Sequence, residues 1–86
     1  MKIKVKFSVF KELSGVDKTE FSLHEGATVK DVLEKIADDF PKFRKLIPQN
    51  EDVYYVCVLL NGRYAVPQTQ LKNYDEISIF PFVGGG

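Results

Sequence analysis

The feature that most constrains this chain is a change in the spacing of its apolar residues. Near the start, apolar and lysine residues alternate, with apolar side chains at Ile3, Val5, Phe7 and Val9. That period of two predicts a half-buried strand. Between residues 29 and 40 the apolar residues instead recur every three or four positions, which predicts an amphipathic helix. Each element has an apolar face to cover, so we expect the helix to pack on a sheet.

The ends of the predicted helix carry their own signals. Thr28 is a suitable N-cap, Asp31 stands three residues later, and Pro41 marks the end. We expect a helical turn in the polar connection that follows, returning three apolar side chains to the core: Phe43, Leu46 and Ile47.

The remaining segments are predicted to be strands. One covers residues 19–23, after a turn that stops at Gly15, and one covers residues 53–60, rich in Val, Tyr and Leu. Asn61-Gly62 is a tight-turn signal, and residues 64–66 return antiparallel. The last strand covers residues 76–80, before Pro81 removes a hydrogen-bond donor and ends the pairing. The resulting fold class is α+β, with about five strands and one main helix on one face of the sheet.

Composition narrows the possible partners. The 86 residues, 44% hydrophobic and 28% charged, predict a single soluble domain over residues 1–86. The chain has 12 Lys+Arg and 12 Asp+Glu, so we expect neither nucleic acid nor a membrane as a partner. His24 has no companion ligand, so no metal site is predicted. A lone cysteine, Cys57, and the absence of an export signal predict a cytoplasmic location.

The strand over residues 53–60 has apolar side chains on both faces, although one helix covers only one. We predict that the uncovered face docks a partner protein, because aromatic residues dominate many interfaces. The predicted interface residues are Leu59, Tyr64, Phe80, Pro81 and Phe82. The alternative is that Phe43, Leu46 and Ile47 fold over that face.

Four segments carry a family resemblance: KELSG, VLLNG, LKNYDEISIF and the terminal FPFVGGG. Together they resemble the MoaD family, the sulfur-carrier small subunits of molybdopterin synthase, and more distantly the thiamine-pathway carrier ThiS. The resemblance spans essentially the whole chain. It implies the ubiquitin-like β-grasp fold, a mixed sheet whose first and last strands lie centrally and parallel, with residues 82–86 as a flexible C-terminal tail.

The chain departs from the family pattern at several positions. Phe82 replaces a second proline and Gly84 a small residue such as Ala, Ser or Thr. Tyr74 replaces a glycine in the turn before the last strand, where a bulky residue tolerates positive φ poorly. Lys11, a further predicted interface residue, replaces a common arginine; it keeps the charge and loses the planar, two-point binding.

The resemblance also implies a chemistry for the tail. Val83, Gly84 and Gly85 are slender enough to thread a narrow channel in a partner. The carboxylate of Gly86 is a poor electrophile at neutral pH, so a MoeB-like enzyme adenylates it with ATP. A sulfur donor then converts it to a thiocarboxylate. A MoaE-like large subunit supplies the catalytic groups, and the sulfur passes to a pterin precursor of the molybdenum or tungsten cofactor. On this view the chain catalyses no reaction alone and binds no cofactor stably.

The same terminus fits other functions. A ubiquitin-like protein modifier would join its terminal glycine to a lysine of a target, and a thiamine-pathway carrier would use the same thiocarboxylate. A pure binding module would need no free terminus. Terminal glycines also occur as unstructured chain ends, but their place directly after the last strand favours a functional tail.

Overall fold

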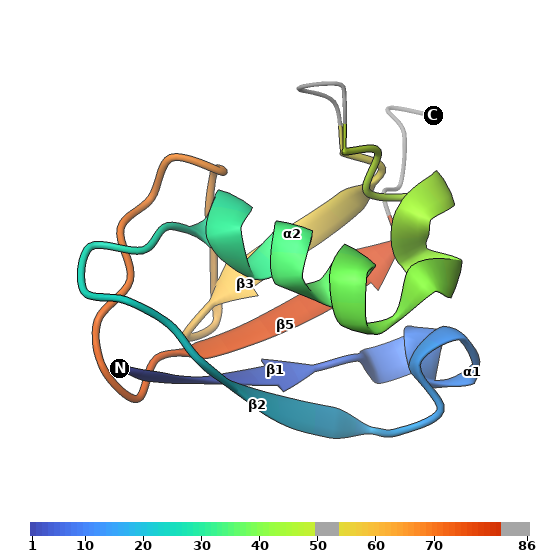
Figure 1. Ribbon diagram of the computed structural model, residues 1–86, viewed down its shortest axis with the longest axis horizontal. Coiled ribbons are helices and arrows are strands. Elements are labelled where there is room, and N and C mark those ends of the chain that lie inside the picture. The colour runs from blue at the N-terminus through green and yellow to red at the C-terminus, as the bar shows by residue number, and fades with distance from the viewer. Residues whose placement is uncertain (50–53, 82–86) are drawn as a thin grey trace.

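A computed structural model of the chain describes residues 1–49 and 54–81. Its centre is a five-stranded sheet with the strand order β2-β1-β5-β3-β4 (Figure 1). The strands are β1 (Lys2–Lys6), β2 (Lys18–Ser22), β3 (Val56–Leu60), β4 (Arg63–Tyr64) and β5 (Glu76–Pro81).

The first and last strands lie side by side in the middle of the sheet. β1 and β5 are parallel, whereas the other three neighbouring pairs are antiparallel. This arrangement confirms the mixed sheet of the β-grasp expectation. It also places the end of β5, from which the tail continues, at the same end of the sheet as the end of β1.

Helix α2 (Val29–Asp39) lies across one face of the sheet (Figure 1). Its start is fixed as predicted: the backbone N–H of Thr28 donates to Oδ2 of Asp31 at 2.8 Å. The helix stops before Pro41, which opens the 3₁₀ helix η2 (Pro41–Lys45). Phe43 and Ile47 are fully buried in the core between helix and sheet. The alternative in which these side chains cover the opposite face is therefore wrong.

The core is formed by the alternate residues of the strands that point toward α2. Ile3, Val5, Ile77 and Ile79 are 0% exposed, and they pack with five residues of the helix: Val29, Val32, Leu33, Ile36 and Ala37. An aromatic cluster closes one end of this core, with ring centroids of Phe7 and Phe40 5.0 Å apart. Within the described ranges, every buried side chain is apolar, so the interior offers no polar group for chemistry.

The structure corrects the expected strand limits. Val9 is 69% exposed and does not belong to the core. The reason is that β1 ends at Lys6, after which Ser8 adopts a φ of 49° and the chain forms η1 (Ser8–Phe10) and α1 (Lys11–Ser14). β4 is shorter than predicted, because a turn follows it in which the N–H of Thr69 donates to the carbonyl of Val66.

Pro81 is the last paired residue of β5 rather than the residue that stops the pairing. It lies opposite Val56 of β3. A proline has no N–H to donate, but its fixed φ fits extended backbone, so it can occupy the end of a strand.

The turns follow the sequence signals. Gly15 closes α1 with a φ of 79°, and Asn61 and Gly62 have φ values of 50° and 85° in the β3–β4 turn. Tyr74 has a φ of 70°, so the turn keeps the left-handed geometry that a glycine would adopt more easily. Among the residues described, no helix has the length and apolar character needed to cross a membrane.

Candidate functional site

The candidate site is the face of the sheet opposite α2, here called the outer face. Strand pairing places five residues in one row across it, in the order Lys18, Lys6, Ser78, Leu59 and Tyr64. Neighbouring strands are about 4.8 Å apart, so this row passes from charged to apolar side chains within a few strand widths. The charged half and the apolar half of the outer face are therefore parts of one continuous surface.

The apolar half of the outer face lies on β3, β4 and the end of β5. Its residues, here called the apolar patch, are Cys57, Leu59, Tyr64, Phe80 and Pro81, and they line one open hollow. Cys57 lies opposite Phe80, and Leu59 lies opposite Tyr64. Tyr64 is 84% exposed, whereas Leu59 and Phe80 are half-buried. The predicted strand faces are therefore confirmed, and four of the six predicted interface residues lie together. Whether they bind a partner stays a prediction.

The tail begins beside this patch. Strand β5 brings the chain to Pro81, one of the patch residues. The remaining predicted site residues lie outside the described ranges: Phe82, Val83, Gly84, Gly85 and Gly86. Their roles in docking, threading and activation stay predictions. Their attachment point, Pro81, lies at the edge of an exposed apolar surface.

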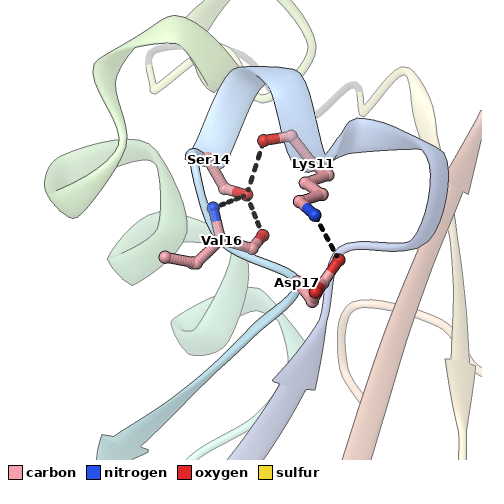
Figure 2. A network of polar contacts seen from close by, with 4 residues as sticks. All are labelled: Lys11, Ser14, Val16 and Asp17. Carbon is pink, nitrogen blue, oxygen red and sulfur yellow. Dashed lines mark hydrogen bonds and ion pairs between the residues drawn. The ribbon is translucent and has the colours of Figure 1, made fainter.

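Lys11 is not part of the apolar patch. It lies in α1, and its Nζ is 3.4 Å from a carboxylate oxygen of Asp17. Figure 2 shows this ion pair. Nearby, the Ser14 hydroxyl donates to the carbonyl of Val16 and accepts from its N–H, which fixes the turn that leads to Asp17. The preceding helix η1 contacts β5. Lys11 therefore belongs to the end of the sheet where β5 finishes, with its ammonium already paired.

The basic half of the outer face was not predicted as a site. Its outward residues, here called the lysine groove, are Lys4, Lys6, Lys18, Glu20 and Glu76, and Thr19 of β2 also lines this hollow. Lys6 and Glu76 form an ion pair at 2.5 Å. A hydrogen bond from Lys6 and the charges of Lys6, Lys4 and Lys18 hold the pKa of Glu76 below its ordinary value. The alternating lysines of the first strand were a signal, but the groove also needs β2 and β5 in the observed register.

The described residues also limit the chemistry available. Across residues 1–49 and 54–81, no three metal-ligating side chains gather in one place. Cys57 is a half-buried member of the apolar patch and forms no disulfide. The outer face is thus built of apolar and charged surface residues, an arrangement suited to contacts with another protein.

The fold and this open face define a small ubiquitin-like domain. Ubiquitin from Caldiarchaeum subterraneum superposes with a TM-score of 0.61, covering 100% of this chain and 98% of that one, at 21% identity. That likeness shows the fold alone. The model of the ThiS family matches residues 7–86.

Individual relatives agree with that family. The molybdopterin synthase sulfur carrier subunit of Chlamydomonas reinhardtii is 36% identical over 100% of both chains. Small archaeal modifier protein 3 of Haloferax volcanii is 34% identical, covering 93% of this chain and 92% of that protein. The solved structure of the Pyrococcus furiosus protein described as molybdopterin converting factor, subunit 1, is 37% identical with a TM-score of 0.82, covering 96% and 99% of the two chains. The chain belongs to the ThiS/MoaD family, as the resemblance implied.

Proposed function

We propose that the chain is the sulfur-carrier small subunit of a molybdopterin synthase. The observation that carries the proposal is the match to sulfur-carrier relatives along the whole chain, together with a terminal segment, FPFVGGG, that continues from the apolar patch. The folded body would act as a handle that docks on the partner. Residues 82–86 would then enter that partner's active site.

The reactive group in this proposal is the carboxylate of Gly86. An oxygen of that carboxylate attacks the α-phosphate of ATP on a MoeB-like activating enzyme, and pyrophosphate leaves. A sulfide-level donor then attacks the acyl carbon, and AMP leaves with the electrons of the broken bond. The product is a thiocarboxylate. Its sulfur is a good nucleophile toward a pterin precursor held by a MoaE-like large subunit, which supplies the catalytic groups.

The size of the side chains in the tail should decide whether Gly86 can reach a partner's active site. Glycines at positions 84, 85 and 86 leave the backbone without side chains and able to pass through a narrow channel. Three residues in extended conformation span about 10 Å. A buried active site can therefore be reached while the body remains outside.

Intact mass spectrometry tests the proposal directly. The chain is incubated with ATP, a MoeB-like enzyme and a sulfur donor, and we expect its mass to rise by the difference between sulfur and oxygen. Deleting Gly86 should abolish the shift, and a Gly86→Val chain should fail to sulfurate the pterin with a MoaE-like subunit. No mass shift in the natural chain, or full pterin sulfuration by Gly86→Val, would rule the proposal out.

A protein-modifier function is a second candidate, favoured by the 34% identity to small archaeal modifier protein 3. The same acyl adenylate would then be attacked by a lysine amine of a target, giving an amide. Lysate blots distinguish the two functions, because the modifier predicts target-linked ladders that vanish when Gly86 is deleted. A thiamine-pathway role would instead appear as sulfur transfer to a thiazole precursor.

A further inference from the structure

The lysine groove, which the proposed function does not use, lies beside the apolar patch. Four lysines and two glutamates lie on this part of the outer face: Lys2, Lys4, Lys6, Lys18, Glu20 and Glu76. They leave a formal excess of two positive charges, although the whole chain has a net charge of +0. Positive charge is thus concentrated on one half of one face.

Ion pairs on this part of the outer face leave two of its lysines available. Lys2 pairs with Glu20 at 3.4 Å, and Lys6 pairs with Glu76. Lys4 lies between Glu20 and Glu76 in the strand register, yet within the described ranges neither Lys4 nor Lys18 forms an ion pair. Both are exposed. A carboxylate brought to this surface would meet two ammonium groups that act on Glu76 only through their charges, without an ion pair.

The groove and the apolar patch are close enough for one partner to cover both. Ser78 of β5 lies between Lys6 of β1 and Leu59 of β3. Two strand spacings separate Lys6 from Leu59, which amounts to about 10 Å. A standard protein interface is several times wider than that.

We infer that the lysine groove is the charged half of the partner-docking surface, and that it binds an acidic segment of the same protein that packs on the apolar patch. A protein is favoured over nucleic acid because the adjoining surface is apolar and because Glu20 and Glu76 interrupt the basic surface that phosphates would follow. Charges at the rim of an interface mainly accelerate association and select partners. The groove would therefore steer the MoeB-like activating enzyme into register with the patch.

The test measures association, so that it does not depend on sulfur chemistry. The inference rests on the proposed function only for the identity of the probe, the purified MoeB-like activating enzyme from the same organism. Association rates are measured by biolayer interferometry between about 0.05 and 0.5 M salt. The variant pairs are Lys4→Gln with Lys18→Gln, and Lys4→Glu with Lys18→Glu. The control pair, Lys42→Gln with Lys45→Gln, removes the same charge from η2.

We expect the glutamine pair to slow association at least about five-fold at low salt, the glutamate pair about ten-fold or more, and both to flatten the salt dependence. The glutamine pair covers the case in which Glu beside Glu20 and Glu76 prevents folding. Groove variants that associate within about two-fold of the control pair overturn the inference. A natural chain that fails to bind the enzyme also overturns the inference. So does a groove that binds inorganic phosphate or single-stranded RNA at about 0.15 M salt while the groove substitutions leave enzyme binding unaffected.

Two further results separate this inference from the proposed function. If the natural chain binds with the expected salt dependence but gains no sulfur, the proposed function fails and the groove assignment stands. If sulfuration proceeds and the groove variants dock like the natural chain, the groove assignment fails alone.

Discussion

The two faces of the sheet use alternate residues of the same strands for different purposes. On β5, Ile77 and Ile79 are 0% exposed beneath α2, whereas Glu76, Ser78 and Phe80 face outward at intermediate exposure. The buried side chains of the inner face are all apolar. The outer face is divided between an apolar patch and a lysine groove, with no element of the described chain over it. The difference indicates that folding depends on one set of residues, while the set between them is free to serve binding.

The strongest test of this difference between the two faces is a pair of neighbouring substitutions on β5. Ile77→Ala should lower the free energy of unfolding by about 2–5 kcal/mol, because it leaves a cavity under α2 that the packed core fills only partly. Ser78→Ala, one residue along and on the outer face, should change it by no more than about 0.5 kcal/mol. Urea unfolding followed by circular dichroism measures both. Equal losses at the two positions would mean that the outer face also contributes to folding.

Tyr64→Ala tests the other side of the comparison. The side chain is 84% exposed, so its loss should leave the free energy of unfolding within about 0.5 kcal/mol. If the apolar patch anchors the partner, the same change should weaken binding about 10-fold to 30-fold, or roughly 1.4–2 kcal/mol. Calorimetric titration with the activating enzyme or the large subunit measures this loss.

The matched control is Tyr74→Ala, which removes another exposed tyrosine from the turn before β5, away from the patch. Its affinity for the partner should match that of the natural chain. An equal loss of affinity in both variants would show that exposed aromatic area in general, rather than the patch, determines binding.

The turns between strands belong to neither face. Tyr74 tests whether a turn residue contributes backbone strain that lowers the stability of the fold. Its φ of 70° is costly for a residue with a bulky side chain. Tyr74→Gly should therefore raise the free energy of unfolding by about 1 kcal/mol, measured by the midpoint of urea unfolding.

Asn61→Gly provides the contrast, because Asn61 also has a positive φ but its side chain is used. Its side-chain Nδ2 donates to Oδ1 of Asp75 at 2.9 Å, and its side-chain Oδ1 accepts from the backbone N–H of Glu76 at 2.9 Å. Removing these bonds should destabilise the chain despite the relief of backbone strain. A destabilising Tyr74→Gly would contradict the assignment of strain at Tyr74, and a stabilising Asn61→Gly would show that the side-chain bonds of Asn61 contribute less than its backbone strain costs.

Much of the inner face could be predicted from sequence, because burial imposes a period. The spacing of Ile3 and Val5, of Ile77 and Ile79, and of the helix residues from Val29 onward each determined which side points inward. Local signals also located the helix start at Thr28 and the turn at Asn61-Gly62. The central, parallel placement of β1 and β5 came from the family resemblance, since no local pattern fixes which strands pair.

The outer face was harder to predict, because it depends on which strands become neighbours. The apolar patch could be predicted from the apolar alternate residues of β3, since an apolar outward side chain is conspicuous there. The lysine groove could not, because Lys18 of β2 and Glu76 of β5 join Lys4 and Lys6 only through pairing with β1. Val9 was assigned wrongly to the core for a related reason: the alternation continues beyond the point where the backbone leaves the sheet at Ser8.

The smallest expected effect concerns Glu76, a carboxylate of the groove. A hydrogen bond from Lys6, followed by the charges of the neighbouring lysines, lowers the pKa of Glu76 below 4.5. Because this pKa is lowered, the ionised carboxylate stabilises the folded chain at pH values above the ordinary pKa of glutamate. That contribution is lost as the pH falls through the lowered pKa of the folded chain. Glu76→Gln should thus reduce the free energy of unfolding slightly at neutral pH, and the difference from the natural chain should shrink as the pH falls through the lowered pKa of Glu76. Added salt should shrink it as well, because the pair is exposed and screened. A difference that stays constant across this pH range, or grows in acid, would show that Glu76 contributes through packing, and the outer face would then share in folding after all.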